Sequence, residues 1–109
     1  PPGLLQSTPQ IGADTAWASG RSGAGWAVAV LDTGVDKNHP FLAGKVVSEA
    51  CYSTTSGSTS TSVCPGGVAS STAAGAGLHC NSAISGCTHG THVAGIVAGS
   101  GAPDGAQGV

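Results

Sequence analysis

The stretch CTHGTHVAGIVAG, residues 87–99, places two histidines three positions apart, ahead of a run of small apolar residues and glycines. Its composition predicts a helix from Thr88 to Ala98, with Thr88 near the N-cap and Gly99 near the C-cap. Residues three apart share one face of a helix. His89 and His92 are therefore open to three interpretations: two metal ligands, a structural pair, or one catalytic base beside a packed neighbour.

The composition narrows the classes of partner. The 109 residues predict one small domain or part of a larger one. Only 7% are charged, against about 25% in average soluble proteins. The cations Arg21, Lys37 and Lys45 are scattered, whereas nucleic-acid binding needs clustered cations that neutralise phosphates. No apolar run approaches the ~20 residues of a membrane span. We therefore expect neither a nucleic acid nor a membrane as partner.

The start of the chain, PPGLLQSTPQIG, has neither a cationic beginning nor a hydrophobic signal core. We interpret the sequence as a mature or trimmed form from which any targeting segment is missing.

Four cysteines lie in sequence rich in Ser, Thr and Gly: Cys51, Cys64, Cys80 and Cys87. An even set in such loops is typical of disulfides in an oxidising compartment, so we expect a secreted protein. We favour the pairs Cys51–Cys64 and Cys80–Cys87, both at the surface, because each closes a short loop. Reduced thiols, or a zinc site built from Cys80, Cys87, His89 and His92, remain alternatives. The cysteine spacing of seven does not match the short spacing of known zinc signatures.

The rest of the chain has short, readable segments. Residues 1–10 are expected to be extended, and 12–20 to form a short helix with Asp14 as its N-cap. Residues 26–32, WAVAVLD, are a continuous apolar run that predicts a buried, parallel strand. A second short strand is expected within residues 45–52.

Asp32 ends the apolar run and is followed by Thr33 and Gly34. In open α/β sheets, ligand-binding and catalytic groups gather beyond the carboxyl ends of parallel strands. Taken alone, however, Asp32 is more simply interpreted as a turn aspartate that accepts a hydrogen bond from a backbone N–H.

The two motifs together change this interpretation. VAVLDTGVDKNHP, residues 28–40, followed by HGTHVAGIVAG, residues 89–99, resembles the subtilisin-like serine proteases, or subtilases. The resemblance implies that Asp32 and His89 are the catalytic aspartate and histidine, that Gly90 keeps the helix start free of a side chain, and that His92 is packed or hydrogen-bonded within the fold. It also implies an α/β fragment of a three-layer fold with a parallel central sheet.

The resemblance further implies that residues 1–109 are the N-terminal part of a peptidase domain. The family's nucleophile block, G-T-S-M-A-x-P, does not occur in this sequence, and Asn38 and Asn81 do not match the family's oxyanion-hole asparagine. The ending at Gly108–Val109 is interpreted as a cut. We therefore expect a secreted endopeptidase that acts on protein or peptide substrates, in which this chain alone is inactive and the remaining C-terminal part completes the site.

Calcium is the one cofactor that the resemblance raises. Many subtilases carry a calcium-binding aspartate directly after the D-x-x-H-P stretch, but this chain has Phe41 there. The later loop offers Asp104 as its only carboxylate, and calcium prefers several oxygen ligands. No cofactor is predicted, and structural calcium remains an alternative that these residues do not favour.

Two other function classes stay open at this point. One is a non-catalytic, subtilase-like binding module. The other is a small protein stabilised by disulfides or zinc, whose motif matches are accidental.

Overall fold

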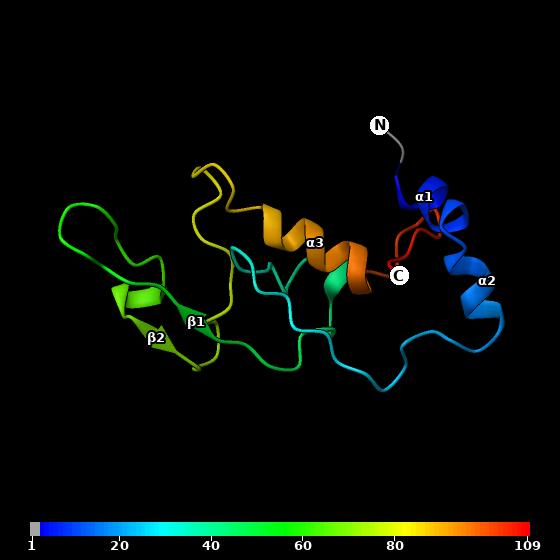
Figure 1. Cartoon of the computed structure of the whole chain (residues 1–109), viewed down its shortest axis with the longest axis horizontal. Coiled ribbons are helices and arrows are strands. Elements are labelled where there is room, and N and C mark those ends of the chain that lie inside the picture. Colours follow the sequence, from blue (N-terminus) through cyan, green and yellow to red (C-terminus); the bar gives the residue numbers. More distant parts are fainter. Residues whose placement is uncertain (1–2) are drawn as a thin grey trace.

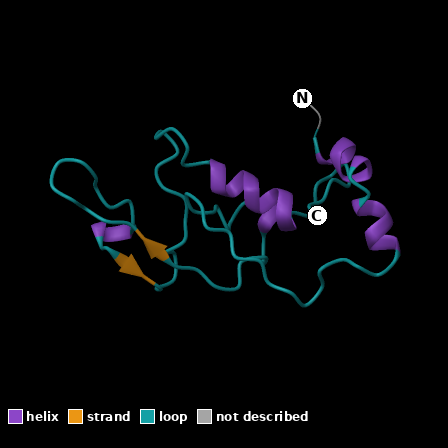
Figure 2. Cartoon of the chain, in the orientation of Figure 1, coloured by secondary structure: helices purple, strands orange, loops and turns teal. Residues whose placement is uncertain are grey.

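Figure 1 shows the computed structural model, which describes residues 3–109. The described chain is elongated, with extents of 51 × 31 × 22 Å. Its elements in chain order are α1 (Leu4–Gln10), α2 (Ala13–Ala18), the 3-10 helix η1 (Pro40–Leu42), β1 (Cys51–Tyr52), the 3-10 helix η2 (Pro65–Gly67), β2 (Ser70–Ser71) and α3 (His89–Ala98). Long loops connect them, and α3 lies in the middle of the arrangement (Figures 1 and 2).

Helix α3 confirms the helix predicted over residues 88–98, with Thr88 and Gly99 as its flanking residues. Its buried positions are Gly90, Ala94 and Gly95. Small residues allow another segment to approach a helix closely, and η1 packs against α3. The backbone carbonyl of Phe41 accepts a hydrogen bond from Ser100 N at 2.9 Å, just after the helix ends. Phe41 thus ties η1 to the end of α3.

The N-terminal region differs from the sequence prediction. Pro1 and Pro2 lie outside the described residues, but from Leu4 onward the chain forms α1 instead of an extended segment. The turn begins because Gly3 O accepts hydrogen bonds from the backbone of Gln6 and Ser7, while the Gln6 side chain accepts one from Gly3 N at 2.8 Å. These local bonds outweigh the extended preference suggested by the prolines.

Helix α2 falls inside the predicted range 12–20, but its N-cap is Gly12 and not Asp14. Gly12 has φ 78°, a left-handed conformation that glycine adopts without steric cost. Asp14 lies in the first turn instead, where a carboxylate interacts favourably with the positive end of the helix dipole. Helices α1 and α2 pack against each other.

Residues 26–32 do not form the predicted buried strand. The segment carries no strand assignment in the described chain (Figure 2), and Trp26 and Leu31 are 87% and 90% exposed. A strand needs a neighbour to satisfy its backbone groups, and the strands described within residues 3–109 pair only with each other. They form a short antiparallel ladder in which Cys51 faces Ser71. The second predicted strand, 45–52, is reduced to β1.

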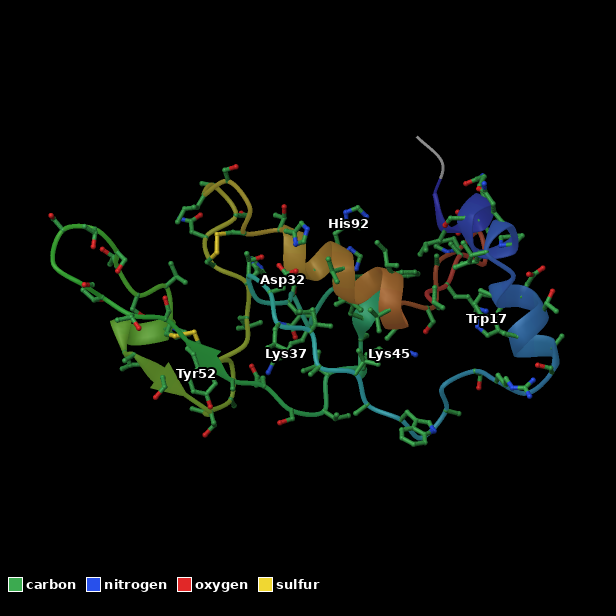
Figure 3. The ribbon with its side chains drawn as sticks, viewed as in Figure 1. Trp17, Asp32, Lys37, Lys45, Tyr52 and His92 are labelled. Carbon is green, nitrogen blue, oxygen red and sulfur yellow. A yellow bond between two sulfur atoms is a disulfide. The ribbon has the colours of Figure 1, made fainter. Side chains whose placement is uncertain are left out.

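Two disulfides join the cysteines locally, Cys51 with Cys64 and Cys80 with Cys87 (Figure 3). These are the two pairs that the sequence analysis favoured. Their Cα atoms lie 5.8 and 5.2 Å apart, within the usual range for disulfides. Cys64 and Cys87 are only 4% and 3% exposed, while Cys51 and Cys80 are partly exposed. Each disulfide therefore has one buried cysteine, and the expectation that both pairs lie at the surface was wrong.

Within residues 3–109, none of the helices combines the length and the apolar character needed to cross a membrane.

Candidate active site

The first site residue, Asp32, lies in the turn at the end of residues 26–32. Its own neighbour holds it, because Thr33 N donates a hydrogen bond to Asp32 Oδ1 at 2.7 Å. Gly34 has φ 95°, a left-handed conformation that glycine adopts without steric cost. The turn is fastened to residues 77–80 by two backbone hydrogen bonds, Val35 N to Gly77 O at 2.9 Å and Cys80 N to Thr33 O at 3.4 Å.

Two threonine hydroxyls join this turn to the first turn of α3. Gly90 N donates to Thr33 Oγ1 at 3.1 Å, and Asp36 N donates to Thr91 Oγ1 at 2.9 Å. The first bond satisfies an N–H group that has no partner inside the helix. Neither threonine was predicted to take part in the site, and the only sequence signal for them is their position directly beside Asp32 and Gly90.

The same junction brings His89 to Asp32. His89 Nδ1 lies 2.9 Å from both carboxylate oxygens of Asp32. The Asp32 side chain is 13% exposed and the imidazole 66% exposed. The hydrogen bond from His89 lowers the pKa of Asp32 below its usual value of 3.8, and the bond from Thr33 N lowers it further. The sequence had paired these two residues only through the resemblance.

This geometry has a chemical consequence. An ionised carboxylate accepts hydrogen bonds only, so it selects the tautomer in which His89 Nδ1 carries the proton. The second nitrogen, Nε2, is then an acceptor on an exposed ring. An imidazole held in this way can take a proton from a hydroxyl group placed beside it.

His92 lies apart from this pair. It is exposed, and Figure 3 shows it directed away from the chain above α3. The expectation that it is packed or hydrogen-bonded within the fold was therefore wrong, because the buried positions of α3 are its small residues Gly90, Ala94 and Gly95. His92 instead lines an open depression of about 480 Å³ together with Asp36, His39, His79, Ser82, Thr88 and Thr91.

The structure does not support the metal-binding alternative at this position. Cys80 and Cys87 are joined in a disulfide, so neither thiolate is free for zinc. Over residues 3–109, no three His, Cys, Asp or Glu side chains converge in a way that could hold a metal ion. The Asp104 carboxylate accepts a hydrogen bond from Ala106 N at 3.0 Å within its own loop.

The ion pair between Lys37 and Glu49, which was not predicted from the sequence, also contacts residues 77–80. Lys37 Nζ lies 2.6 Å from Glu49 Oε2, and Glu49 Oε1 accepts a hydrogen bond from Gly77 N at 2.9 Å. The Lys37 bond first, and the Gly77 bond second, lower the pKa of Glu49. No motif marked this pair, whose members are twelve positions apart with η1 between them.

The chain is similar in sequence to known proteins. The sequence model of the Subtilase family, Peptidase_S8, matches residues 23–109. The chain is similar to the minor extracellular protease Vpr of Bacillus subtilis (strain 168), with 51% identity over 41 residues, which are 38% of this chain and 5% of Vpr. It is also similar to furin of Bos taurus, with 59% identity over 29 residues, or 27% of this chain and 4% of furin.

The matched segments therefore span a small part of these relatives. No solved structure matches the chain. The family match covers most of the 109 residues and includes both Asp32 and His89. This chain belongs to the subtilase family.

Proposed function

We propose that the protein containing this chain is a secreted serine endopeptidase of the subtilisin type. One observation carries the proposal: His89 Nδ1 is 2.9 Å from both oxygens of Asp32, while the ring itself is 66% exposed. Such an arrangement orients a general base and leaves its second nitrogen open to a nucleophile.

In the proposed reaction, a serine hydroxyl attacks the carbonyl carbon of a peptide bond and His89 Nε2 takes its proton. Asp32 stabilises the imidazolium that forms. His89 then donates the proton to the departing amine, and water releases the acyl group in a second round. The serine and the oxyanion-hole donor belong to the remaining C-terminal part of the domain, because the 109 residues contain neither motif. We accordingly propose that this chain alone is inactive.

The rest of the domain would also supply neighbouring strands for residues 26–32. Trp26, Val28 and Leu31 are 87%, 66% and 90% exposed. Burying apolar surface stabilises by about 25 cal/mol per Å², so burial of these exposed apolar side chains against a neighbouring element would be favourable. We propose that residues 26–32 are a parallel strand of a three-layer α/β fold once the C-terminal part is present.

Secretion is supported by two independent observations. Four of four cysteines are paired in disulfides, which persist mainly in oxidising compartments. One similar protein, Vpr, is described as an extracellular protease.

A fluorophosphonate probe tests the proposal, because it bonds covalently to a serine activated by a neighbouring histidine. The full-length protein, its His89→Ala variant and the 109-residue chain would be exposed to the probe and analysed by mass spectrometry. We expect one adduct on the full-length protein, at a serine outside these 109 residues, and none on the other two. Equal labelling of the His89→Ala variant, or no labelling of the folded full-length protein, would contradict the proposal.

A further inference from the structure

The Cys80–Cys87 disulfide closes a loop that ends two residues before His89. Within that loop, Cys87 N donates to Ile84 O at 3.2 Å, and His89 N donates to Gly86 O at 3.1 Å. The backbone that leads into His89 is therefore hydrogen-bonded to the disulfide-bonded loop. Cys87, the last residue of that loop, is buried, with 3% exposure.

The other end of the loop touches the turn that carries Asp32. Cys80 N donates to Thr33 O at 3.4 Å. Gly34 lies so close to this segment that a Cβ on it would be 2.7 Å from His79 Cα. Cys80 is thus fastened to the Asp32 side of the site, while Cys87 is fastened to the His89 side.

The disulfide therefore links the segment that contacts the turn carrying Asp32 to the segment that leads into His89. His89 receives little support from packing, since its side chain is 66% exposed. Its place relative to Asp32 is set by the backbone on both sides of the helix start. Downstream, the hydroxyls of Thr33 and Thr91 hold that backbone. Upstream, the covalent link is the Cys80–Cys87 bond.

We propose that Cys80–Cys87 is a positioning disulfide that holds His89 against Asp32, and that its reduction separates the two side chains. The catalytic consequence rests on the proposed peptidase function, but the structural consequence does not. Reduction would proceed by exchange with a dithiol: the dithiol gives up two electrons and becomes a disulfide, while Cys80 and Cys87 each gain a proton as thiols.

The second disulfide supplies a matched control. Cys51–Cys64 closes a loop of similar kind beside β1 and η2, in the part of the chain that lies away from α3 (Figure 3). None of the hydrogen bonds described above between the Asp32 turn and α3 involves it. Its loss would remove a crosslink without touching the site.

The experiment compares Cys80→Ser/Cys87→Ser with Cys51→Ser/Cys64→Ser in the full-length protein. The first readout is the low-field NMR signal of the His89 Nδ1 proton, which reports its hydrogen bond to Asp32. The second is the separation of kcat from KM on a peptide substrate. We expect the Cys80/Cys87 variant to lose the low-field signal and to lower kcat by about tenfold or more, with KM changed less than about twofold, because misplacing a catalytic group affects turnover strongly. The control is expected to keep both.

Retention of the signal and of kcat in the Cys80/Cys87 variant would overturn the proposal. If that variant does not fold, the Cys51→Ser/Cys64→Ser protein is reduced with a dithiol and reoxidised. Loss and return of the signal while the circular-dichroism spectrum stays that of the folded protein supports the proposal. An unchanged signal, or a signal that is lost only together with the fold, overturns it. An unlabelled, inactive protein that nevertheless shows the redox-dependent signal would count against the peptidase function alone.

Discussion

Gly90, in the first turn of α3, lies against the carbonyl of Gly34, so that a Cβ on Gly90 would overlap the Gly34 carbonyl oxygen and lie 3.2 Å from Asp32 Cβ. This close approach lets the helix start reach the turn that carries Asp32. At this junction His89 Nδ1 lies 2.9 Å from both oxygens of the Asp32 carboxylate.

We expect Gly90→Ala to separate the turn from the helix and to lower the free energy of unfolding by about 1–3 kcal/mol, the usual cost of overpacking a tight contact. The matched control is Gly95→Ala in the same helix. Its Cβ would lie 3.5 Å from the Phe41 ring, an ordinary contact, and alanine favours helix over glycine by about 1 kcal/mol. Denaturant unfolding of the two variants measures the difference; equal stabilities would contradict the close-approach explanation.

The lowered pKa of Asp32 gives a prediction about pH. A carboxyl whose pKa is lower in the folded state stabilises the fold above its unfolded-state pKa, and this contribution is lost as pH falls through the folded-state pKa. For Asp32 the loss lies below its usual value of 3.8. Because the His89 hydrogen bond is the largest cause, we expect the pKa of Asp32 to rise toward 3.8 in His89→Ala.

An NMR titration of the carboxyl carbon checks this shift. Glu49 is the internal control, since Lys37 and Gly77 lower its pKa without any part played by His89. An Asp32 pKa that stayed in place, or a Glu49 pKa that moved with it, would argue against the assigned cause.

Phe41 gives a prediction about stability. Its ring occupies the space beside Gly95 and Gly99, where a Cβ on Gly99 would overlap ring atoms. Since the ring is only partly buried, we expect Phe41→Ala to lower the free energy of unfolding by about 1–3 kcal/mol. Tyr52→Ala is the control, because Tyr52 is 78% exposed and such surface changes usually stay within about 0.5 kcal/mol. A Phe41→Ala variant as stable as the control would mean that the ring does not brace the end of α3.

Local features of the fold were predicted best from the sequence, because their signals lie in neighbouring residues. Helix α3 was predicted from its run of small apolar residues between Thr88 and Gly99, and the structure agrees because the signals for a helix are local. The Asp32–His89 pair was predicted only through the two motifs, since nothing local indicates a contact between residues 57 positions apart.

The failures have physical causes as well. Residues 26–32 have the composition of a buried strand, but burial depends on partners that the described residues do not supply. Helix α1 was not predicted, because the prolines at the start of the chain suggested an extended segment. The hydrogen bonds between Gly3 and Gln6 that begin the helix were not anticipated. His92 was expected to be packed, yet which face of α3 is covered is decided by η1 and the Asp32 turn, whose positions the sequence does not reveal.

The most direct test of the central claim compares His89→Ala with His92→Ala in the full-length protein, with kcat on a peptide substrate as the measurement. His89 contacts Asp32, so we expect its loss to lower kcat by about 10⁶-fold, as removal of the base of such a triad does. His92 is exposed and lies outside the pair, so His92→Ala should leave kcat within about twofold and stability within about 0.5 kcal/mol. A folded His92→Ala protein without activity, together with an active His89→Ala protein, would contradict the assignment of the catalytic base.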